Sequence, residues 1–215
     1  MPPAPTISPR GALARLLKGN QRFVEGRSDH PATGMPRERA AAARTDEHLP
    51  VAAVLACADA RLPVYRIFDQ GIGDLFVVRV AGNVCGPKMT GSLEFGVTLL
   101  GAPLLLVLGH TDCGAVKAAI EHTDLPGNIG AVLDLVAPAV RQAEEERPGK
   151  SPSVNRVVAL NAFHSIERLL THSELIADLV REDRLLVVAA VYDIQTGAVE
   201  LLGEHPDQRR LLGSD

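Results

Sequence analysis

The sequence contains no tryptophan, and its aromatic residues make up only 3% of 215 residues. It has no continuous apolar stretch near the ~20 residues of a membrane-spanning helix, and its first ten residues form no apolar signal region. Lys and Arg number 22 against 26 Asp and Glu, so the chain lacks the basic excess that binds nucleic acid or anionic membranes. We therefore expect a cytoplasmic protein without nucleic-acid or membrane partners.

Cysteine is also scarce, with only Cys57, Cys85 and Cys113 in the chain. An odd and low number of cysteines in a chain of cytoplasmic character argues against a disulfide framework. Metal binding or thiol chemistry is then the better explanation for any cysteine that lies beside polar partners.

The hydrophobic content of 46% is enough for a substantial core, and the length suits one α/β domain. We expect residues 1–215 to form that single domain. The proline-rich residues 1–9 are interpreted as a loose tail. Residues 10–25 have the apolar spacing of an amphipathic helix, an arm that packs on another surface.

Short apolar runs alternate with segments of helical spacing along the rest of the chain, which predicts an α/β fold. We expect a mainly parallel sheet of four strands plus a C-terminal edge strand, flanked by helices. The predicted strands are 51–56, 75–80, 104–108, 185–191 and the edge strand 198–202, and the predicted helices are 92–100, 115–121, 129–146, 154–170 and 173–182.

Polar side chains with metal-binding character follow two of the apolar runs. Cys57 comes directly after the first run, and His110 and Cys113 follow the third. Because functional crevices lie off the carboxyl ends of parallel strands, neighbouring strands would bring these side chains together. Two thiolates and one imidazole suit zinc, and three protein ligands leave a fourth position open, as in catalytic sites. Asp59 is the remaining candidate for that position.

Arg61 follows Asp59 at the spacing of a bidentate ion pair, which would lower the pKa of the Asp59 carboxyl. Each feature alone has an ordinary explanation. A cysteine at a strand end is often a small core residue, His-x-x-Cys occurs by chance, and Asp-x-Arg is often a surface ion pair. The combination at the ends of two buried runs favours a metal site.

At this point the sequence resembles the β-class carbonic anhydrases. The resemblance lies in Cys-x-Asp-x-Arg followed, about fifty residues on, by His-x-x-Cys-Gly, and it extends over most of the chain. The segments that carry it are ALARLLKGNQRFVEG, IFDQGIGDLFVVRVAGN, GSLEFGVTLLG, VLGHTDCGAVKAA and VYDIQTGAVELL.

The resemblance implies a zinc lyase that interconverts CO2 and bicarbonate through zinc-bound hydroxide, with one Zn²⁺ per chain. Cys57, His110 and Cys113 would bind the metal, and Asp59 and Arg61 would form the catalytic dyad. Asp59 could also bind zinc in a closed, inactive form. Family members are dimers or higher assemblies with sites near the dimer interface, so the resemblance implies a homodimer or homotetramer in which the N-terminal arm would clasp the partner subunit. The implied substrate-binding residues are His48, Phe76, Phe95 and Gly114.

Several positions depart from the family pattern. His48 stands where many members have a hydrogen-bonding Gln; it is either a substitute donor or proton shuttle, or a surface residue. Tyr65 replaces a Glu, and Phe95 replaces a Tyr of the pocket. Cys85 is interpreted as a bystander. Arg79 matches an arginine of a regulatory pocket that needs the missing tryptophan, so we expect it in a structural ion pair.

Two alternatives to CO2 hydration stay open. The same zinc site could hydrolyse CS2 or COS, which are linear like CO2. The chain could also be a catalytically silent zinc-binding subunit with an assembly or sensor role, although the intact Asp59–Arg61 pair argues against this.

Overall fold

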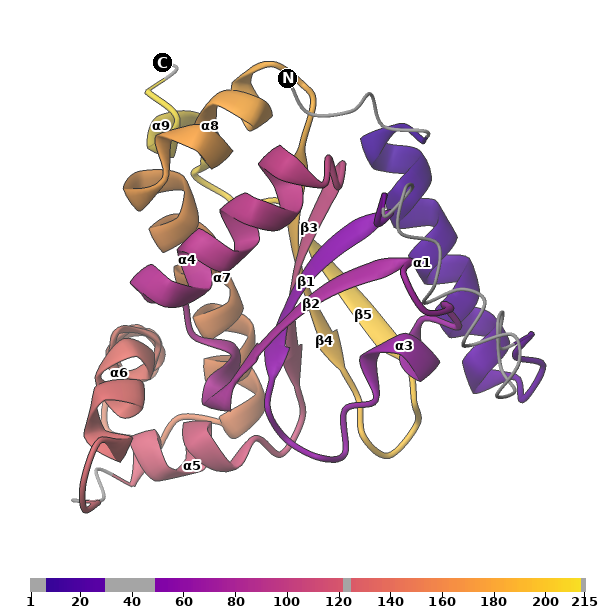
Figure 1. Ribbon diagram of the computed structural model, residues 1–215. Coiled ribbons are helices and arrows are strands. Elements are labelled where there is room, and N and C mark those ends of the chain that lie inside the picture. Colours follow the sequence, from indigo (N-terminus) through magenta and orange to yellow (C-terminus); the bar gives the residue numbers. More distant parts are fainter. Residues whose placement is uncertain (1–6, 30–48, 122–124, 214–215) are drawn as a thin grey trace.

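The computed structural model describes residues 7–29, 49–121 and 125–213 (Figure 1). Its centre is a five-stranded sheet with the strand order β2-β1-β3-β4-β5, in which β5 alone runs antiparallel to its neighbour. The predicted α/β fold, with four parallel strands and a C-terminal edge strand, is therefore confirmed. The strands are β1 (Ala52–Cys57), β2 (Leu75–Val80), β3 (Leu104–His110), β4 (Leu186–Tyr192) and β5 (Val199–Gly203).

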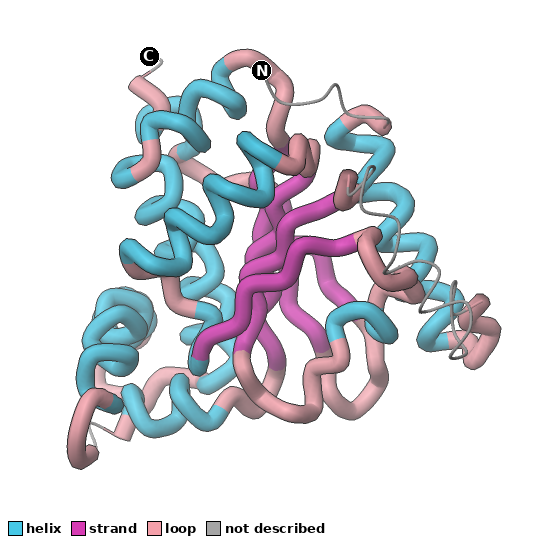
Figure 2. Tube along the Cα trace, viewed as in Figure 1, coloured by secondary structure: helices cyan, strands magenta, loops and turns pink. Residues whose placement is uncertain are grey.

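Helices flank this sheet and account for most of the remaining described residues (Figure 2). The short elements α3, η1 and α9 were not predicted, because three or four residues are too few to show a helical period. The helical elements are α1 (Pro9–Val24), α3 (Val64–Ile67), the 3-10 turn η1 (Ala81–Asn83), α4 (Pro87–Glu94), the π-helical turn η2 (Phe95–Leu99), α5 (Gly114–Ile120), α6 (Ile129–Glu146), α7 (Val154–His172), α8 (Glu174–Arg181) and α9 (Gln208–Leu211).

Strands β1, β3 and β4 are buried along their whole length, which explains why they are continuous apolar runs. Successive side chains point to opposite faces of the sheet. Val54 therefore packs in a cluster with Leu16 of α1, whereas Leu55 packs in a second cluster with Leu93 of α4. Figure 1 shows α1 on one side of the sheet and α4, α7 and α8 on the other.

Helix α1 begins earlier than the sequence suggested. Ser8 caps it, with its side-chain oxygen accepting a hydrogen bond from the Gly11 N–H at 3.1 Å, and Pro9 occupies the first turn. The prediction of a loose tail through residue 9 is therefore wrong at its C-terminal end. Ala12 and Leu16 are fully buried against the sheet of the same chain. Within the described part of the chain, no helix combines the length and the apolar character needed to cross a membrane.

The sheet order creates the place where a site can form. Strand β1 lies between β2 and β3. The chain therefore passes from β1 to β2 on one side of it, and later forms β3 on the other side. At such a switch point the connections after the two central strands diverge, and a crevice opens off their carboxyl ends. Cys57 is the last residue of β1 and His110 is the last residue of β3.

Candidate active site

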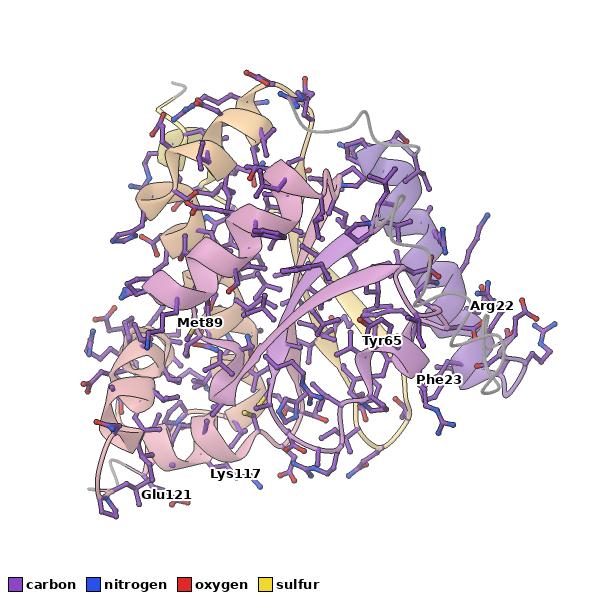
Figure 3. The ribbon with its side chains drawn as sticks, viewed as in Figure 1. Arg22, Phe23, Tyr65, Met89, Lys117 and Glu121 are labelled. Atoms are coloured by element: carbon purple, nitrogen blue, oxygen red, sulfur yellow. The ribbon has the colours of Figure 1, made fainter. Side chains whose placement is uncertain are left out.

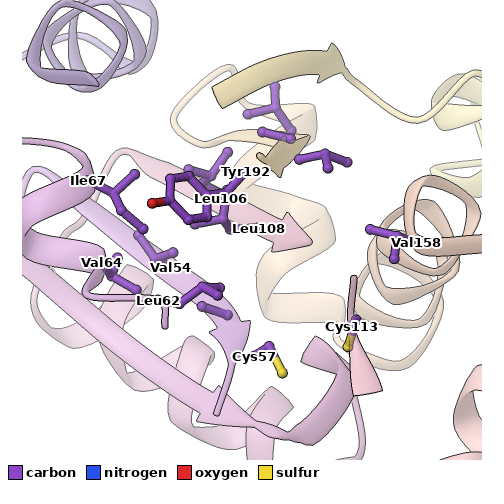
Figure 4. Packing of buried hydrophobic residues seen from close by; sticks show 14 of the residues in the cluster. Val54, Cys57, Leu62, Val64, Ile67, Leu106, Leu108, Cys113, Val158 and Tyr192 are labelled. Atoms are coloured by element: carbon purple, nitrogen blue, oxygen red, sulfur yellow. The ribbon is translucent and has the colours of Figure 1, made fainter. Parts of the chain in front are cut away.

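Cys57, His110 and Cys113 converge off the carboxyl ends of β1 and β3, as the sequence predicted. All three are buried, and their ligand atoms lie within 4.8 Å of one another. Tetrahedral zinc with sulfur and nitrogen ligands places those atoms about 3.5–4 Å apart, so small side-chain movements would complete the geometry. Figure 4 shows both thiols beside the apolar core residues, Cys57 at the end of β1 and Cys113 just before α5.

The orientation of the His110 ring fits a metal ligand. Its side chain is fully buried, and Nδ1 lies 2.9 Å from the backbone oxygen of Thr111. A carbonyl only accepts hydrogen bonds, so Nδ1 carries the proton and Nε2 presents its lone pair. Among the described residues Nε2 has no hydrogen-bond partner. An unpartnered buried nitrogen beside two thiols is the arrangement that a bound metal ion would satisfy.

The two thiols have different surroundings. The pKa of Cys57 is lowered to about 4, mainly by a hydrogen bond from the Cys113 thiol and also by the backbone N–H groups of Asp59 and Gly82. The Gly82 nitrogen lies 3.3 Å from the Cys57 sulfur. The pKa of Cys113 is raised, because its thiol donates to Cys57 and is buried. A divalent cation bound between the two sulfur atoms would favour the thiolate form of both.

Asp59 and Arg61 form a bidentate pair beside these ligands. Arg61 Nε lies 3.0 Å from Asp59 Oδ1, and Nη2 lies 2.6 Å from Oδ2. The Arg61 backbone N–H also donates to Oδ1 at 2.9 Å. These hydrogen bonds hold the pKa of the Asp59 carboxyl well below its usual range, so it is ionised at neutral pH. Oδ2 lies 4.0 Å from His110 Nε2, so the carboxylate borders the ligand cluster while Arg61 engages both of its oxygens.

Two neighbouring residues support this pair in ways that the sequence did not reveal. The sequence predicted an ion pair for Arg79. This prediction is wrong, because Arg79 has no acidic partner among the described residues. Its guanidinium donates to the backbone oxygens of Cys57 and Asp59 and so ties the end of β1 to β2. Asp112, which has a left-handed backbone (φ 62°), accepts from Arg61 Nη1 at 3.4 Å. Asp112 also pairs with Lys117 on α5, at the edge of the molecule (Figure 3).

The predicted substrate-binding residues do not all lie beside the Cys57–His110–Cys113 cluster. His48 lies outside the described residues. Phe76 stacks on Phe95, with 6.1 Å between ring centroids, and pairs in register with Ala53. Since Ala53 precedes Cys57 by four positions, Phe76 lies about 13 Å along the sheet from the metal ligands. Of this predicted set, only the exposed Gly114 adjoins the cluster within the described part of the chain, directly after Cys113.

The two other positions singled out from the sequence have local structural partners. Cys85 is buried, and its sulfur lies 3.3 Å from the hydroxyl of Thr90, outside the ligand cluster. Tyr65 on α3 donates from its hydroxyl to the backbone oxygen of Leu75 at 2.9 Å, at the start of β2. Figure 3 shows Tyr65 near Phe23 of α1, on the side of the sheet away from α4.

Comparisons with known proteins agree with this geometry. A family model described as carbonic anhydrase matches residues 52–199. Carbonic anhydrase 2 of Mycobacterium tuberculosis is 36% identical over 204 residues, which covers 92% of this chain and 94% of that protein. A carbonic anhydrase of Mycolicibacterium smegmatis is also 36% identical, with coverage of 92% and 95%.

Solved structures give the same result at the level of the fold. The crystal structure of the β-carbonic anhydrase CafA from Aspergillus fumigatus superimposes with a TM-score of 0.73 at 25% identity, covering 94% of each chain. Tetrameric β-carbonic anhydrases from Sordaria macrospora share the fold at 21% identity, with a TM-score of 0.67 over 89% of this chain and 96% of that chain. From the family model, the relatives and the fold together, this chain belongs to the β-carbonic anhydrase family.

Proposed function

We propose that this protein catalyses the reversible hydration of CO2 to bicarbonate and a proton, with one Zn²⁺ per chain held by Cys57, His110 and Cys113. The observation that carries the proposal is the buried Cys-His-Cys cluster, with its unpartnered His110 nitrogen, beside the ionised Asp59–Arg61 pair. When bound, zinc would lower the pKa of a coordinated water molecule and so supply a nucleophile at neutral pH.

The dyad would control where that water lies. The Asp59 carboxylate borders the open side of the cluster and can accept a hydrogen bond from the water, which orients a lone pair toward CO2. Arg61 contributes by occupying both carboxylate oxygens, which keeps Asp59 ionised and turned away from direct metal binding. Without Arg61, Asp59 would be free to take the fourth ligand position and exclude water.

Neither alternative reading of the sequence is favoured by the similarities to known proteins. Hydrolysis of CS2 or COS would use the same ligands, but no described residue distinguishes those substrates from CO2. A silent zinc-binding subunit would have no need for the bidentate Asp59–Arg61 pair. Release of sulfide from CS2, measured on the same zinc-loaded sample, would separate the sulfur substrates from CO2.

A homo-oligomer is part of this proposal. Among the described strands β2 has a neighbour on one side only, so its outer backbone groups would be available to a second chain. Phe95 is 48% exposed and Leu99 is more exposed still, although both are large apolar side chains near that edge. Light scattering of the parent and of Phe95→Glu tests this, and an unchanged mass would contradict it.

We also propose a cytoplasmic location, because all three cysteines are free and cytosolic proteins keep their thiols reduced. Cell fractionation followed by antibody detection would test this, and recovery in an oxidising extracellular fraction would contradict it.

Stopped-flow CO2 hydration on protein of known zinc content, from pH 7 to 9, tests the proposed activity. Turnover across this range is expected if Arg61 keeps Asp59 away from the metal. Turnover only above about pH 8 would indicate instead that Asp59 binds zinc at neutral pH. A zinc-loaded protein without turnover at any pH would overturn the proposed function.

A further inference from the structure

Helix α7 carries a polar stripe on a face that is otherwise buried and apolar. Asn161, Ser165 and Arg168 have the spacing i, i+4 and i+7, so they lie along one side of the helix. Asn161 and Ser165 are almost fully buried. Because buried polar groups destabilise a fold unless they are hydrogen-bonded, we expect these side chains to have hydrogen-bond partners.

Those partners are three carbonyl groups of the segment that follows β2. Asn161 Nδ2 donates to the oxygen of Gly82 at 2.7 Å, and Ser165 Oγ donates to the oxygen of Asn83 at 3.1 Å. Arg168 Nε donates to the oxygen of Cys85 at 3.3 Å. One face of α7 thus holds the backbone of residues 82–85 at three points.

The held segment has a backbone that needs support. Gly82 and Asn83 both adopt left-handed conformations, with φ of 69° and 42°. Glycine reaches this region readily, and asparagine does so more often than most other residues, but the conformation is still uncommon outside glycine and benefits from contacts that hold it. The result of this turn is that the Gly82 N–H points at the Cys57 sulfur, 3.3 Å away.

We propose that Asn161 is a positioning residue for the metal ligand Cys57. Its amide fixes the Gly82 carbonyl, and through the left-handed turn it fixes the direction of the Gly82 N–H toward the thiolate. This inference rests on the proposed zinc site. An N–H donor to a ligating thiolate stabilises the negative charge and orients the sulfur, and loss of such outer contacts typically weakens metal binding about 10–100-fold. Asn161 acts one step further out, so the lower end of that range applies.

The chain offers a matched control in Asn20 on α1. This residue is also a buried asparagine that holds backbone, since its Nδ2 donates to the oxygens of Ile67 and Gly197 at 3.1 and 2.9 Å. Its Oδ1 accepts from the Val199 N–H at 2.9 Å. None of these partners belongs to the segment 82–85. Asn20→Ala therefore removes a comparable side chain without touching the donor to Cys57.

The experiment measures zinc affinity of the full chain by competition with a chromophoric chelator, for the parent, Asn161→Ala and Asn20→Ala. We expect Asn161→Ala to bind zinc about tenfold more weakly than Asn20→Ala. With Co²⁺ in place of zinc, the thiolate-to-cobalt absorption band should shift in Asn161→Ala and stay unchanged in Asn20→Ala. A merely structural role for Asn161 would lower the melting temperature of both variants and leave the band unmoved.

Equal zinc affinity and identical cobalt spectra for the two variants would overturn the proposal. If Asn161→Ala cannot be obtained folded, Ser165→Ala takes its place in the zinc-affinity measurement. A zinc affinity severalfold weaker than that of Asn20→Ala would support the role of the α7 stripe, and an equal affinity would contradict it. A parent protein that binds no zinc would overturn the proposed zinc site itself, and the positioning role with it.

Discussion

Cys57 and Cys85 are both buried cysteines, and each lies close to the carboxyl end of one of two paired strands. The pKa of Cys57 is nevertheless lowered, to about 4, by a hydrogen bond from Cys113 and by further donors. The pKa of Cys85 is raised by burial, which its contact with Thr90 offsets only in part. Burial alone therefore keeps a thiol protonated and unreactive, whereas converging donors turn an equally buried thiol into a candidate metal ligand.

Of the substitutions that test this difference between the two cysteines, removal of a ligand thiol should have the largest effect on zinc content and activity. Cys57→Ala and Cys113→Ala each leave two protein ligands where a catalytic zinc site needs three. We expect loss of stoichiometric zinc and a fall of CO2 hydration to the uncatalysed rate, measured by metal analysis and stopped-flow assay of the same samples. Near-parental turnover in either variant would show that the cluster is not the active centre.

Substitutions in the Asp59–Arg61 dyad should have the second-largest effect on activity, because the dyad acts on the water and not on the metal. Asp59→Asn removes the charge that accepts the hydrogen bond, and Arg61→Lys cannot reproduce the bidentate contact. We expect kcat/KM to fall about a hundredfold in each, while bound zinc stays at the parental level. Variants that lose zinc and activity together would indicate that the pair holds the site together and takes no part in the reaction.

Metal removal should destabilise the protein, since it leaves the buried His110 Nε2 without a hydrogen-bond partner among the described residues. Zinc at about a thousandfold its Kd adds about 4 kcal/mol to the unfolding free energy. For a chain of this size that corresponds to about 8–16 °C in Tm. Differential scanning calorimetry before and after chelation should show this drop in the parent but not in Cys57→Ala. An unchanged Tm in the parent would argue against zinc at this cluster.

The smallest effect is expected at Cys85. In Cys85→Ala a small buried group and its contact with Thr90 are lost, which costs about 1 kcal/mol and lowers Tm by about 2–4 °C. Zinc content and kcat/KM should match the parent, which makes this variant the control for both ligand-thiol variants. A Cys85→Ala protein with depleted zinc would break the distinction between the two cysteine environments.

The sequence predicted the ligand cluster because its residues stand at the ends of recognisable strands. Cys57 and His110 terminate apolar runs, and the parallel arrangement of those runs follows from their alternation with helices. Helix α1 begins one residue before its predicted start, because Ser8 caps it. Helix α4 begins at Pro87, five residues before the predicted helix 92–100. These are differences at element boundaries, where local composition is a weak guide.

The supporting contacts could not be predicted in the same way. Arg79 donates to backbone oxygens of the neighbouring strand, and a backbone acceptor leaves no trace in the residue pattern. Asn161 stands alone within the apolar segment VVALNAF, which marks it as unusual but does not name its partner, 79 positions away. The Asn161 contact depends on the packing of α7 against the segment 82–85, which exists only in the folded chain.

The most direct test of the account is a zinc titration of metal-free protein with CO2 hydration measured at each step. We expect the rate to rise in proportion to bound zinc and to level off at one zinc per chain, in the parent and in Cys85→Ala alike, with no rise in Cys113→Ala. A parent chain that binds zinc at the cluster yet hydrates no CO2 between pH 7 and 9 would contradict it.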